Sequence, residues 1–289
     1  MNLSNHDDFR FFYPLRVRWA EVDMQKIVFN AHYLMYLDTA VADYWRALAL
    51  PYEQAMQQFD GDVFVKKASV EYHASARYDD QLQIGLKCQR VGNSSFVFEG
   101  AIFRGEALLV GAELLYVFAD PATQKSRPVP APLRAMFAAF ERGESMVTVQ
   151  VGSWDTLGPE ATRLRHEVLV QEQGIDPGLV DDGADGQALH VLARNHLGMP
   201  VATGRLQQHG PGVGKLARMA VSRVLRGSGL GLQVLDALLE SARLRGDHGV
   251  VLQAQRRAQG FYARAGFLTQ GEPFEVFGTP HIEMTRSLR

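Results

Sequence analysis

The sequence has a single cysteine, Cys88, among its 289 residues. One thiol can form neither an internal disulfide nor a cysteine-based metal cluster, and such sparse cysteine usage is typical of a reducing compartment. The chain also lacks any run of about 20 apolar residues, and its first segment, Met1 to Arg10, has no apolar stretch. We therefore expect a cytoplasmic protein with no secretory signal and no membrane-spanning segment.

An excess of charge of either sign is also missing. The 30 Lys+Arg residues nearly balance the 32 Asp+Glu residues, so the formal net charge is −2. Because a polyanion such as DNA is held mainly by positive charge, this balance argues against nucleic acid as a partner. Hydrophobic residues make up 46% of the chain and charged residues 21%, a composition that excludes disorder as the main state.

The length is about twice that of a common domain of roughly 100 to 150 residues, so two domains are expected. Lysine usage differs between the halves, because Lys215 is the single lysine after residue 146. A proline-rich stretch over 128–132, a short apolar helix and a polar segment mark the joint. We predict a first domain over residues 1–140, a linker over 141–146 and a second domain over 147–289.

The first half has the pattern of one long helix and an antiparallel sheet. A short strand is predicted over 15–19, and apolar residues spaced by three and four between Tyr33 and Leu48, with Leu34 among them, predict an amphipathic helix. Short connections between the strand-like runs that follow imply antiparallel pairing. These runs cover residues 64–72, 81–91, 95–104 and 107–118. A helix packed on such a sheet is an α+β architecture.

Asp23 stands a few residues before the predicted start of that helix. The first amides of a helix have no internal partner and together carry roughly half a positive charge. A carbonyl oxygen docked there would be polarised, and Asp23 could attack it or serve as a base for water. The alternative is a carboxylate that only complements the helix dipole. His32 is interpreted as packed or solvated, and Glu21 as solvated or paired with a nearby arginine.

The segment from Arg18 to Leu34 and the order of the elements resemble the hotdog-fold acyl-CoA thioesterases of the 4-hydroxybenzoyl-CoA thioesterase type, over about residues 10 to 140. The resemblance implies thioester hydrolysis, with Asp23 as the catalytic residue and the backbone amides of Asn30 and Ala31 polarising the thioester carbonyl. It also implies a helix wrapped by the sheet and a homo-oligomer, either a dimer or a tetramer.

The same resemblance places the CoA nucleotide near a turn between central strands. That turn carries Arg90, Asn93, Ser94 and Ser95. The sequence departs from the family pattern at two places. Lys26 stands where glycine is usual, and Asn30 and His32 are exchanged relative to many members, which leaves the role of each open.

The second half alternates helices and strands. Helices are predicted over 161–171, 229–245 and 259–265, and strands over 188–194, 199–207, 215–221, 250–255 and near Phe274 and His281. The strand, helix, strand order from Lys215 to Gln255 predicts a parallel crossover. This half is expected to be an α/β domain with a mixed sheet, and the crossover is its expected ligand-binding part.

Between Arg218 and Gly231 an apolar strand leads through arginines into a glycine-rich turn that opens a helix. Glycines let the backbone approach an anion closely, and a helix N-terminus presents free amides to it. The pattern Arg226-x-x-Gly229-x-Gly231 resembles the acetyl-CoA pyrophosphate motif of the GNAT N-acetyltransferase superfamily. The resemblance, which extends over 147–289, implies that pyrophosphate is held by Arg226, Gly227, Ser228, Gly229, Leu230 and Gly231.

The stretch from Gln259 to Phe267 resembles the late helix of the same superfamily. By this resemblance the strand around Met219 to Val221 pairs with the pantetheine arm of CoA, and Tyr262 is the general acid for the departing thiolate. A thiol of pKa near 8.5 leaves more easily when a proton donor is close by. The alternative for Tyr262 is a core aromatic residue on an amphipathic helix.

The segment from Arg163 to Gly174 resembles the acceptor side of one GNAT branch, and acyl-homoserine-lactone synthases share a comparable layout. Four later residues belong to the same resemblance, and the carboxylates among them could position or deprotonate an amine, or could simply be solvated. They are Asp181, Asp182, Asp185 and His190. The three aspartates lack the spacing and terminal glutamate of a calcium loop, so we assign no metal.

The sequence thus predicts a hotdog acyl-CoA thioesterase fused to a GNAT acyltransferase, with acyl-CoA or acetyl-CoA as substrate and an amine acceptor that the residues do not identify. The alternative is that one domain is catalytic and the other is a CoA-binding, regulatory or oligomerising module. A third possibility is a single acyl chain that passes between the two sites.

Overall fold

The computed structural model describes residues 5–276 and 278–288. The chain divides into two compact units, one ending at Met146 and the other beginning at Val147. Each unit has its own sheet, five-stranded in the first and seven-stranded in the second. Within the described residues no helix is long and apolar enough to cross a membrane.

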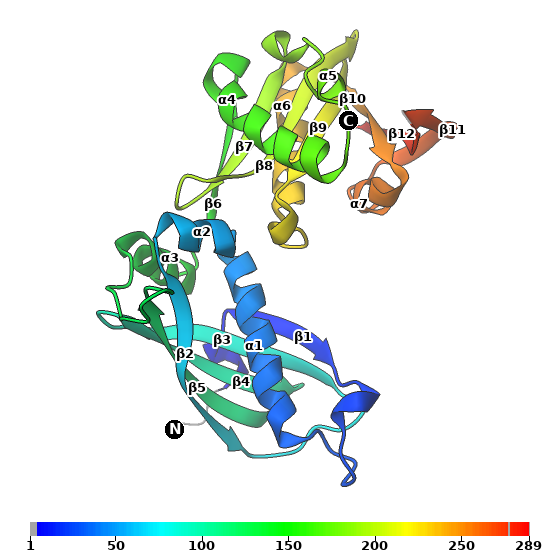
Figure 1. The fold of residues 1–289 in the computed structure, drawn as a ribbon. Coiled ribbons are helices and arrows are strands. Elements are labelled where there is room, and N and C mark those ends of the chain that lie inside the picture. Colours follow the sequence, from blue (N-terminus) through cyan, green and yellow to red (C-terminus); the bar gives the residue numbers. More distant parts are fainter. Residues whose placement is uncertain (1–4, 277, 289) are drawn as a thin grey trace. The chain divides into compact units, whose positions relative to one another are not determined.

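In the first unit an antiparallel sheet curves around the long helix α1 (Asn30–Ala47), as Figure 1 shows. The strands lie in the order β1-β3-β4-β5-β2, and every neighbouring pair is antiparallel. Their bounds are β1 Phe11–Arg16, β2 Asp62–Tyr72, β3 Gln81–Val91, β4 Ser95–Arg104 and β5 Ala107–Ala119. Two shorter helices, α2 (Tyr52–Gln58) and α3 (Ala131–Glu141), complete the unit. The predicted helix and antiparallel sheet are confirmed.

One face of α1 is buried against the sheet. The buried residues recur at steps of three and four and are Tyr33, Tyr36, Leu37, Ala40, Val41, Tyr44 and Trp45. The rings of Tyr44 and Trp45 contact Phe98 of β4 edge-on. The placement of Leu34 on this face was wrong: it is 43% exposed, because Tyr36 and Leu37 are the residues three and four positions after Tyr33 and fill the stripe.

The strand predicted over 15–19 is also wrong in its position. β1 ends at Arg16, and Trp19–Glu21 form a short 3₁₀ turn. The Glu21 carboxylate accepts the Arg18 amide at 2.7 Å, and this hydrogen bond turns the chain where an extended strand was expected.

In the second unit the strands lie in the order β11-β12-β10-β9-β8-β7-β6. The pair β9 and β10 is parallel and the other neighbours are antiparallel, so the sheet is mixed, as predicted. The strand bounds are β6 Val147–Gly152, β7 Leu189–Asn195, β8 Pro200–Gly210, β9 Val213–Val221, β10 Gly249–Gln255, β11 Leu268–Val276 and β12 Thr279–Ser287. The helices are α4 Trp154–Arg165, α5 Pro177–Val180, α6 Leu230–Arg245 and α7 Gln259–Arg264.

Helix α6 forms the crossover between β9 and β10. Its apolar face, which includes Val234 and Leu238, packs on β8 so closely that a Cβ at Gly204 would lie 2.7 Å from a Leu238 methyl group. The helix predicted over 161–171 differs, because α4 begins at Trp154 and a π-helix follows over His166–Glu172. Pro159 lies inside α4. Because proline disfavours the interior of a helix, the turns of α4 around it were not predicted as helical.

Candidate active sites

A pocket of about 350 Å³ beside the start of α1 contains Asp23. Its lining comes from the loop before α1, the first turn of α1 and the end of β2: Asp23, Gln25, Ile27, Val28, Phe29, Asn30, Tyr33, Tyr72, His73, Ala74 and Ser75. One carboxylate oxygen of Asp23 accepts the Gln25 amide at 2.8 Å. The second oxygen has no partner within the described part of the chain, so it is available to a substrate or a water.

The N-terminus of α1 lies beside this pocket. The amides of Asn30 and Ala31 have no acceptor among the described residues, whereas the amide of His32 donates to the Phe29 carbonyl at 2.9 Å. Asn30 lines the pocket with Asp23, and Ala31 does not. The structure therefore brings a carboxylate and the positive end of a helix to one place.

A tight turn presents Asp23. The Asp23 amide donates to the Ile27 carbonyl and the Lys26 amide donates to the Asp23 carbonyl, both at 2.9 Å. Lys26 has a φ of 62°, a conformation that costs a side-chain-bearing residue about 1–2 kcal/mol. This is the position where the thioesterase pattern has glycine, and the two backbone hydrogen bonds hold the turn despite the lysine.

Glu21, two residues before Asp23, is held in place by hydrogen bonds from Arg18 and Tyr36. Its buried carboxylate accepts hydrogen bonds from the Arg18 amide (2.7 Å), the Arg18 Nε (2.6 Å) and the Tyr36 hydroxyl (2.7 Å). Burial alone would raise the pKa of Glu21, but these hydrogen bonds outweigh it and lower that pKa. Pairing with a nearby arginine, one of the two alternatives for Glu21, is confirmed.

His32 is half-buried on α1, and its ring contacts Phe29 edge-on. Its Nδ1 is covered and has no hydrogen-bond partner in the described ranges. The turn with Arg90, Asn93, Ser94 and Ser95 lies elsewhere: none of these residues lines the Asp23 pocket. The carbonyls of Asn93 and Ser94 accept the amides of Val129 and Phe118, at 2.8 and 2.9 Å, which fixes the turn.

In the second unit, the glycine-rich turn before α6 has the backbone shape that an anion site requires. Gly227 and Gly229 have φ values of 88° and 85°, which side-chain-bearing residues rarely adopt. The amides of Gly227, Gly229, Leu230 and Gly231 have no acceptor within residues 5–276 and 278–288. These free amides lie at the N-terminal end of α6, where negative charge is stabilised.

Arg226 begins this turn, and its guanidinium forms a bidentate pair with Glu172 of the π-helix. The hydrogen bonds from Arg226 lower the pKa of Glu172. Both side chains reach solvent, with exposed fractions of 42% for Arg226 and 22% for Glu172. The positive charge expected for a pyrophosphate is therefore present but already has a partner.

Tyr262 lies on α7 with its ring against Phe261 and Phe267. The side chain is 9% exposed, and burial raises the pKa of its hydroxyl to about 12. The hydroxyl has no hydrogen-bond partner in the described part of the chain and stays protonated at neutral pH. Tyr262 is thus a packed aromatic residue that also holds a proton.

β9 and β10 pair only where Val213–Leu216 lie beside Gly249–Leu252, and beyond this point they separate. β9 then carries a bulge, because Ala217 pairs with Arg205 and Ala220 with Thr203. Two residues of β9, Arg218, whose φ is 54°, and Met219, lie opposite the single residue Gly204 of β8. The edge of β9 from Met219 to Val221 is therefore left without a strand partner on the β10 side.

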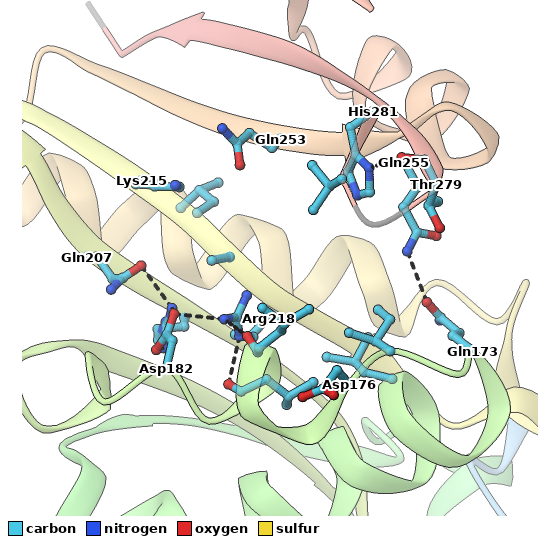
Figure 2. A pocket seen from close by; sticks show the side chains of 18 of the residues that line it. Gln173, Asp176, Asp182, Gln207, Lys215, Arg218, Gln253, Gln255, Thr279 and His281 are labelled. Carbon is cyan, nitrogen blue, oxygen red and sulfur yellow. Dashed lines mark hydrogen bonds and ion pairs between the residues drawn. The ribbon is translucent and has the colours of Figure 1, made fainter. Parts of the chain in front are cut away.

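A cavity of about 610 Å³ lies over this separation (Figure 2). Its polar floor comes from β8, β9, β10 and β12 and consists of Arg205, Gln207, Lys215, Arg218, Gln253, Gln255 and His281. A wall is supplied by the segment 169–182, and the Gln255 amide donates to the Gln173 side-chain oxygen at 3.2 Å. Sequence reasoning missed Lys215, Gln253, Gln255 and His281, although the alternation of polar residues along β10 was a usable signal.

The acidic residues expected near the acceptor are engaged in ion pairs. Asp182 accepts two hydrogen bonds from Arg205 and one from Arg218, each of 2.7 Å. The Arg205 hydrogen bonds hold the pKa of Asp182 well below its usual range. Asp185 accepts from Arg165 and Arg205 at 2.9 Å, and Asp181 lies 2.8 Å from His166. Asp182 and Asp185 therefore position other residues and are poorly suited to deprotonating an amine.

His190 is fully buried in the same cluster. The Arg165 guanidinium donates to its Nδ1 at 2.9 Å, so the ring proton is on Nε2, which donates to the Asp185 carbonyl at 2.9 Å. Burial lowers the pKa of His190 and keeps the ring neutral. This histidine is enclosed by its own partners and does not line the cavity.

Both units match known families. Residues 25–110 match the family model described as "Thioesterase superfamily", and residues 178–288 match the one described as "Acetyltransferase (GNAT) domain". The acyl-CoA thioester hydrolase YbgC of Escherichia coli O6:H1 is 33% identical over 128 residues, which cover 44% of this chain and 95% of that protein. The Bacillus subtilis protein named "Putative acetyltransferase BSU40680" is 36% identical over 129 residues, covering 44% of this chain and 86% of that protein.

Among solved structures, the 1,4-dihydroxy-2-naphthoyl-CoA thioesterase Slr0204 from Synechocystis is 21% identical and aligns with a TM-score of 0.42, covering 44% of this chain and 95% of its own. The two sequence relatives each match one unit over most of their own length. The chain is therefore a two-domain CoA-thioester enzyme that belongs to the thioesterase superfamily through its first unit and to the GNAT acetyltransferases through its second.

Proposed function

We propose that the first unit hydrolyses acyl-CoA at the Asp23 pocket. The observation that carries this proposal is the presence of Asp23 and the free N-terminus of α1 in one cavity. The thioester carbonyl oxygen would accept the amides of Asn30 and Ala31, which stabilise the negative charge that develops there. Two roles for Asp23 fit this geometry, attack on the carbonyl carbon and activation of a water that attacks it.

Either route breaks the C–S bond and releases a carboxylic acid and free CoA thiol. The test is thiol release from short, long and aromatic acyl-CoAs by the wild type and by Asp23→Asn. Asparagine preserves the hydrogen bond to Gln25 but removes the charge, so we expect a loss of about 10²-fold or more in kcat. Asp38→Asn, an exposed substitution on α1 outside the pocket lining, is the matched control. Equal activity in Asp23→Asn and the wild type would refute the proposal.

We further propose that the second unit transfers the acyl group of acyl-CoA to an amine. The free amides between Gly227 and Gly231 would hold the pyrophosphate, with Ser228 in the same turn and Arg226 exchanging Glu172 for a phosphate oxygen. The unpaired edge of β9 from Met219 to Val221 would hydrogen-bond the pantetheine arm. Tyr262, whose hydroxyl has no hydrogen-bond partner in the described part of the chain, would give its proton to the departing thiolate.

Tyr262→Phe tests the second activity. Phenylalanine retains the contacts with Phe261 and Phe267 and removes only the hydroxyl, so folding should be preserved while amine-dependent thiol release falls by about 10²-fold. Hydrolysis in the absence of amine should not change. If one of the two activities is missing from the wild type, we infer that the corresponding unit is a CoA-binding, regulatory or oligomerising module.

A second copy of the chain is the partner we propose for the first unit. β2 is an edge strand of its sheet, and it carries three exposed large hydrophobic residues, Phe64, Val65 and Tyr72. An unpaired apolar edge of this kind favours association with another chain. Sedimentation should show a dimer or tetramer, and Val65→Lys should dissociate it. The single cysteine supports the cytoplasm as the proposed compartment.

A further inference from the structure

We propose that the amine accepted by the second unit carries an anionic group several bonds away from its nitrogen, that Lys215 binds this anion, and that His281 takes the proton from the amine. The proposal rests on the acyl transfer proposed above and names the acceptor class for that site. Four observations carry it: the register of the cavity floor, the charge balance of its lining, the tautomer of His281 and the spacing of the two residues.

The floor is a continuous polar face of the sheet. Lys215 of β9 lies directly opposite Gln207 of β8, and Gln255 of β10 lies directly opposite His281 of β12. Residues paired in this way present their side chains to the same face. All four line the cavity, as does Gln253, which is two residues before Gln255 and on the same face. Figure 2 shows Lys215 and His281 at separate places along this floor.

Among the cationic side chains that line the cavity, Lys215 differs from the two arginines because it has no ion-pair partner in the described residues. Arg205 pairs with Asp182 and Asp185, and Arg218 pairs with Asp182 and also donates to the Val180 carbonyl at 2.9 Å. Lys215 makes no ion pair and no hydrogen bond in the described part of the chain. A half-buried ammonium between glutamine amides, with no carboxylate of its own, is suited to an anion supplied by a ligand.

His281 supplies a proton acceptor at the other end of the floor. Its Nδ1 lies 2.8 Å from the Thr279 carbonyl, and since a carbonyl can only accept, the ring proton is on Nδ1. Nε2 is then the nitrogen with the free lone pair. Of the two carboxylates in the lining, Asp182 is held by arginines. Asp176 accepts the Gly178 amide at 2.8 Å through one oxygen as the cap of α5, and it belongs to the wall segment 169–182 and not to the floor that carries His281.

The spacing of the two residues sets the length of the acceptor. Lys215 lies opposite Val251, and His281 lies opposite Gln255, four residues further along β10. β9 and β12 lie on opposite sides of β10. At about 3.3 Å per residue along the strands and about 4.8 Å between neighbouring strands, the two backbone positions are about 16 Å apart. The side chains shorten this span only partly, so the amine and the anion belong to different ends of the acceptor and not to one carbon atom, as they do in an α-amino acid.

The transfer step that we infer combines His281 as the base with Tyr262, the acid proposed above. The neutral amine nitrogen forms a bond to the thioester carbonyl carbon, and the C–S bond breaks. The proton lost by nitrogen goes to Nε2 of His281, and the thiolate takes the proton of Tyr262, so the products are an amide and CoA thiol. His281 is a catalytic residue in this step and Lys215 is a specificity determinant.

The experiment measures acetylated product by mass spectrometry with the full chain, acetyl-CoA and a matched panel of amines. The anionic acceptors are 5-aminopentanoate and 4-aminobutylphosphonate, which distinguish a carboxylate from a phosphonate. The comparison amines are pentylamine, which lacks the anion, glycine, in which it is too close, and 1,4-diaminobutane, in which a cation replaces it. We expect kcat/KM to be at least tenfold higher for an anionic acceptor than for each comparison amine.

Two variants assign the roles. Lys215→Met should raise KM for the anionic acceptor at least tenfold and leave kcat/KM for pentylamine unchanged, which a merely structural defect would not do. Arg243→Met, on the exposed face of α6 and outside the cavity lining, is the control and should match the wild type. His281→Gln should lower kcat at least tenfold with either amine while KM stays within twofold.

Equal use of pentylamine and 5-aminopentanoate by the wild type, or an equal loss of both in Lys215→Met, would overturn the acceptor class. Unchanged kcat in His281→Gln would overturn the assignment of the base. Calorimetry with acetyl-CoA on the wild type and on Gly229→Ala, which disturbs the turn before α6 in the second unit, separates this failure from failure of the proposed function. If Gly229→Ala loses binding that the wild type has and no amine in the panel is acetylated, the acceptor proposal is wrong while CoA recognition by the second unit stands; if the two proteins bind acetyl-CoA equally or not at all, both are wrong.

Discussion

Arg226 and Glu172 form a bidentate ion pair at the mouth of the glycine-rich turn. The same guanidinium is the charge expected to meet a pyrophosphate, so ligand binding must replace one anionic partner by another. An exposed pair of this kind contributes about 0.2–1 kcal/mol. The cost of breaking it is therefore small compared with the gain from a doubly charged ligand.

This competition predicts that Glu172→Gln tightens CoA binding. Removing the carboxylate frees Arg226 and removes a negative charge near the phosphates, so we expect Kd to fall by up to about fivefold at low salt, the equivalent of about 1 kcal/mol. Calorimetry with CoA measures it. Arg226→Met should weaken binding, and Glu240→Gln on the exposed face of α6 should have no effect. Weaker binding by Glu172→Gln would contradict the exchange of partners.

Gly229→Ala should damage the turn before α6. Gly229 has a φ of 85°, so alanine is strained by about 1–2 kcal/mol and the free amides lose their arrangement. CoA affinity and the stability of α6 should both fall. Gly231→Ala is a stringent control, because a Cβ there meets only ordinary contacts, 3.5 Å from Phe261 and 3.6 Å from Val221. Calorimetry should give wild-type affinity for Gly231→Ala; equal losses in both variants would contradict the argument from φ.

Glu21 should make the first unit acid-sensitive. Its pKa in the folded protein is below the ordinary value of 4.5, so its stabilising effect is complete above that value and is lost as the pH falls through the folded pKa. Glu21→Gln should cost about 1–3 kcal/mol at pH 7, because the hydrogen bonds from Arg18 and Tyr36 weaken. The difference in the free energy of unfolding between wild type and variant should become smaller below pH 4.5.

Hydrogen exchange of α1 peptides as a function of urea concentration measures the difference in unfolding free energy between wild type and Glu21→Gln for the first unit alone. Glu113→Gln is the control, since this residue is 40% exposed and lies 3.8 Å from Lys67. It should show almost no such difference at either pH. A difference for Glu21→Gln that stays constant from pH 7 to pH 3 would refute the assignment.

Lys26→Gly should stabilise the Asp23 loop. The lysine adopts a φ of 62°, and glycine removes a penalty of about 1 kcal/mol. Met24→Gly is the control: this residue is fully exposed in the same loop, and its φ is not positive, so glycine there brings only the entropic cost. Exchange in the peptide over 22–29 should slow in Lys26→Gly and not in Met24→Gly.

The sequence predicted the central strands of the first unit well. β3 and β4 were predicted with their observed bounds, because alternating apolar residues end at the turn signals Gly92-Asn93 and Gly105. Helix α2 was missed because it has seven residues and buries only Ala55 and Met56, too few for a helical period to show. Short elements of this kind are decided by tertiary packing.

The candidate sites also differ in how much of them the sequence could predict. Asp23 and the turn from Arg226 to Gly231 are local patterns, so their residues could be named before their geometry was known. The cavity floor could not, because the bulge at Arg218 and the pairing of Gln255 with His281 join residues far apart in the chain. The aspartates at 181, 182 and 185 were named from the sequence, but their arginine partners were not, because these come from three different elements.

The separation of β9 from β10 leaves an open edge in the interior of a seven-stranded sheet. Peptide groups there have to find a partner outside the sheet, and bound CoA would supply it in the manner of an added strand. Ligand that binds only the folded state adds stability, about 2.7 kcal/mol at a hundredfold excess over Kd. The melting temperature of the second unit should therefore rise when CoA is bound. Acyl-CoAs ranked by the rise in melting temperature that they cause would show which acyl group this unit binds most tightly.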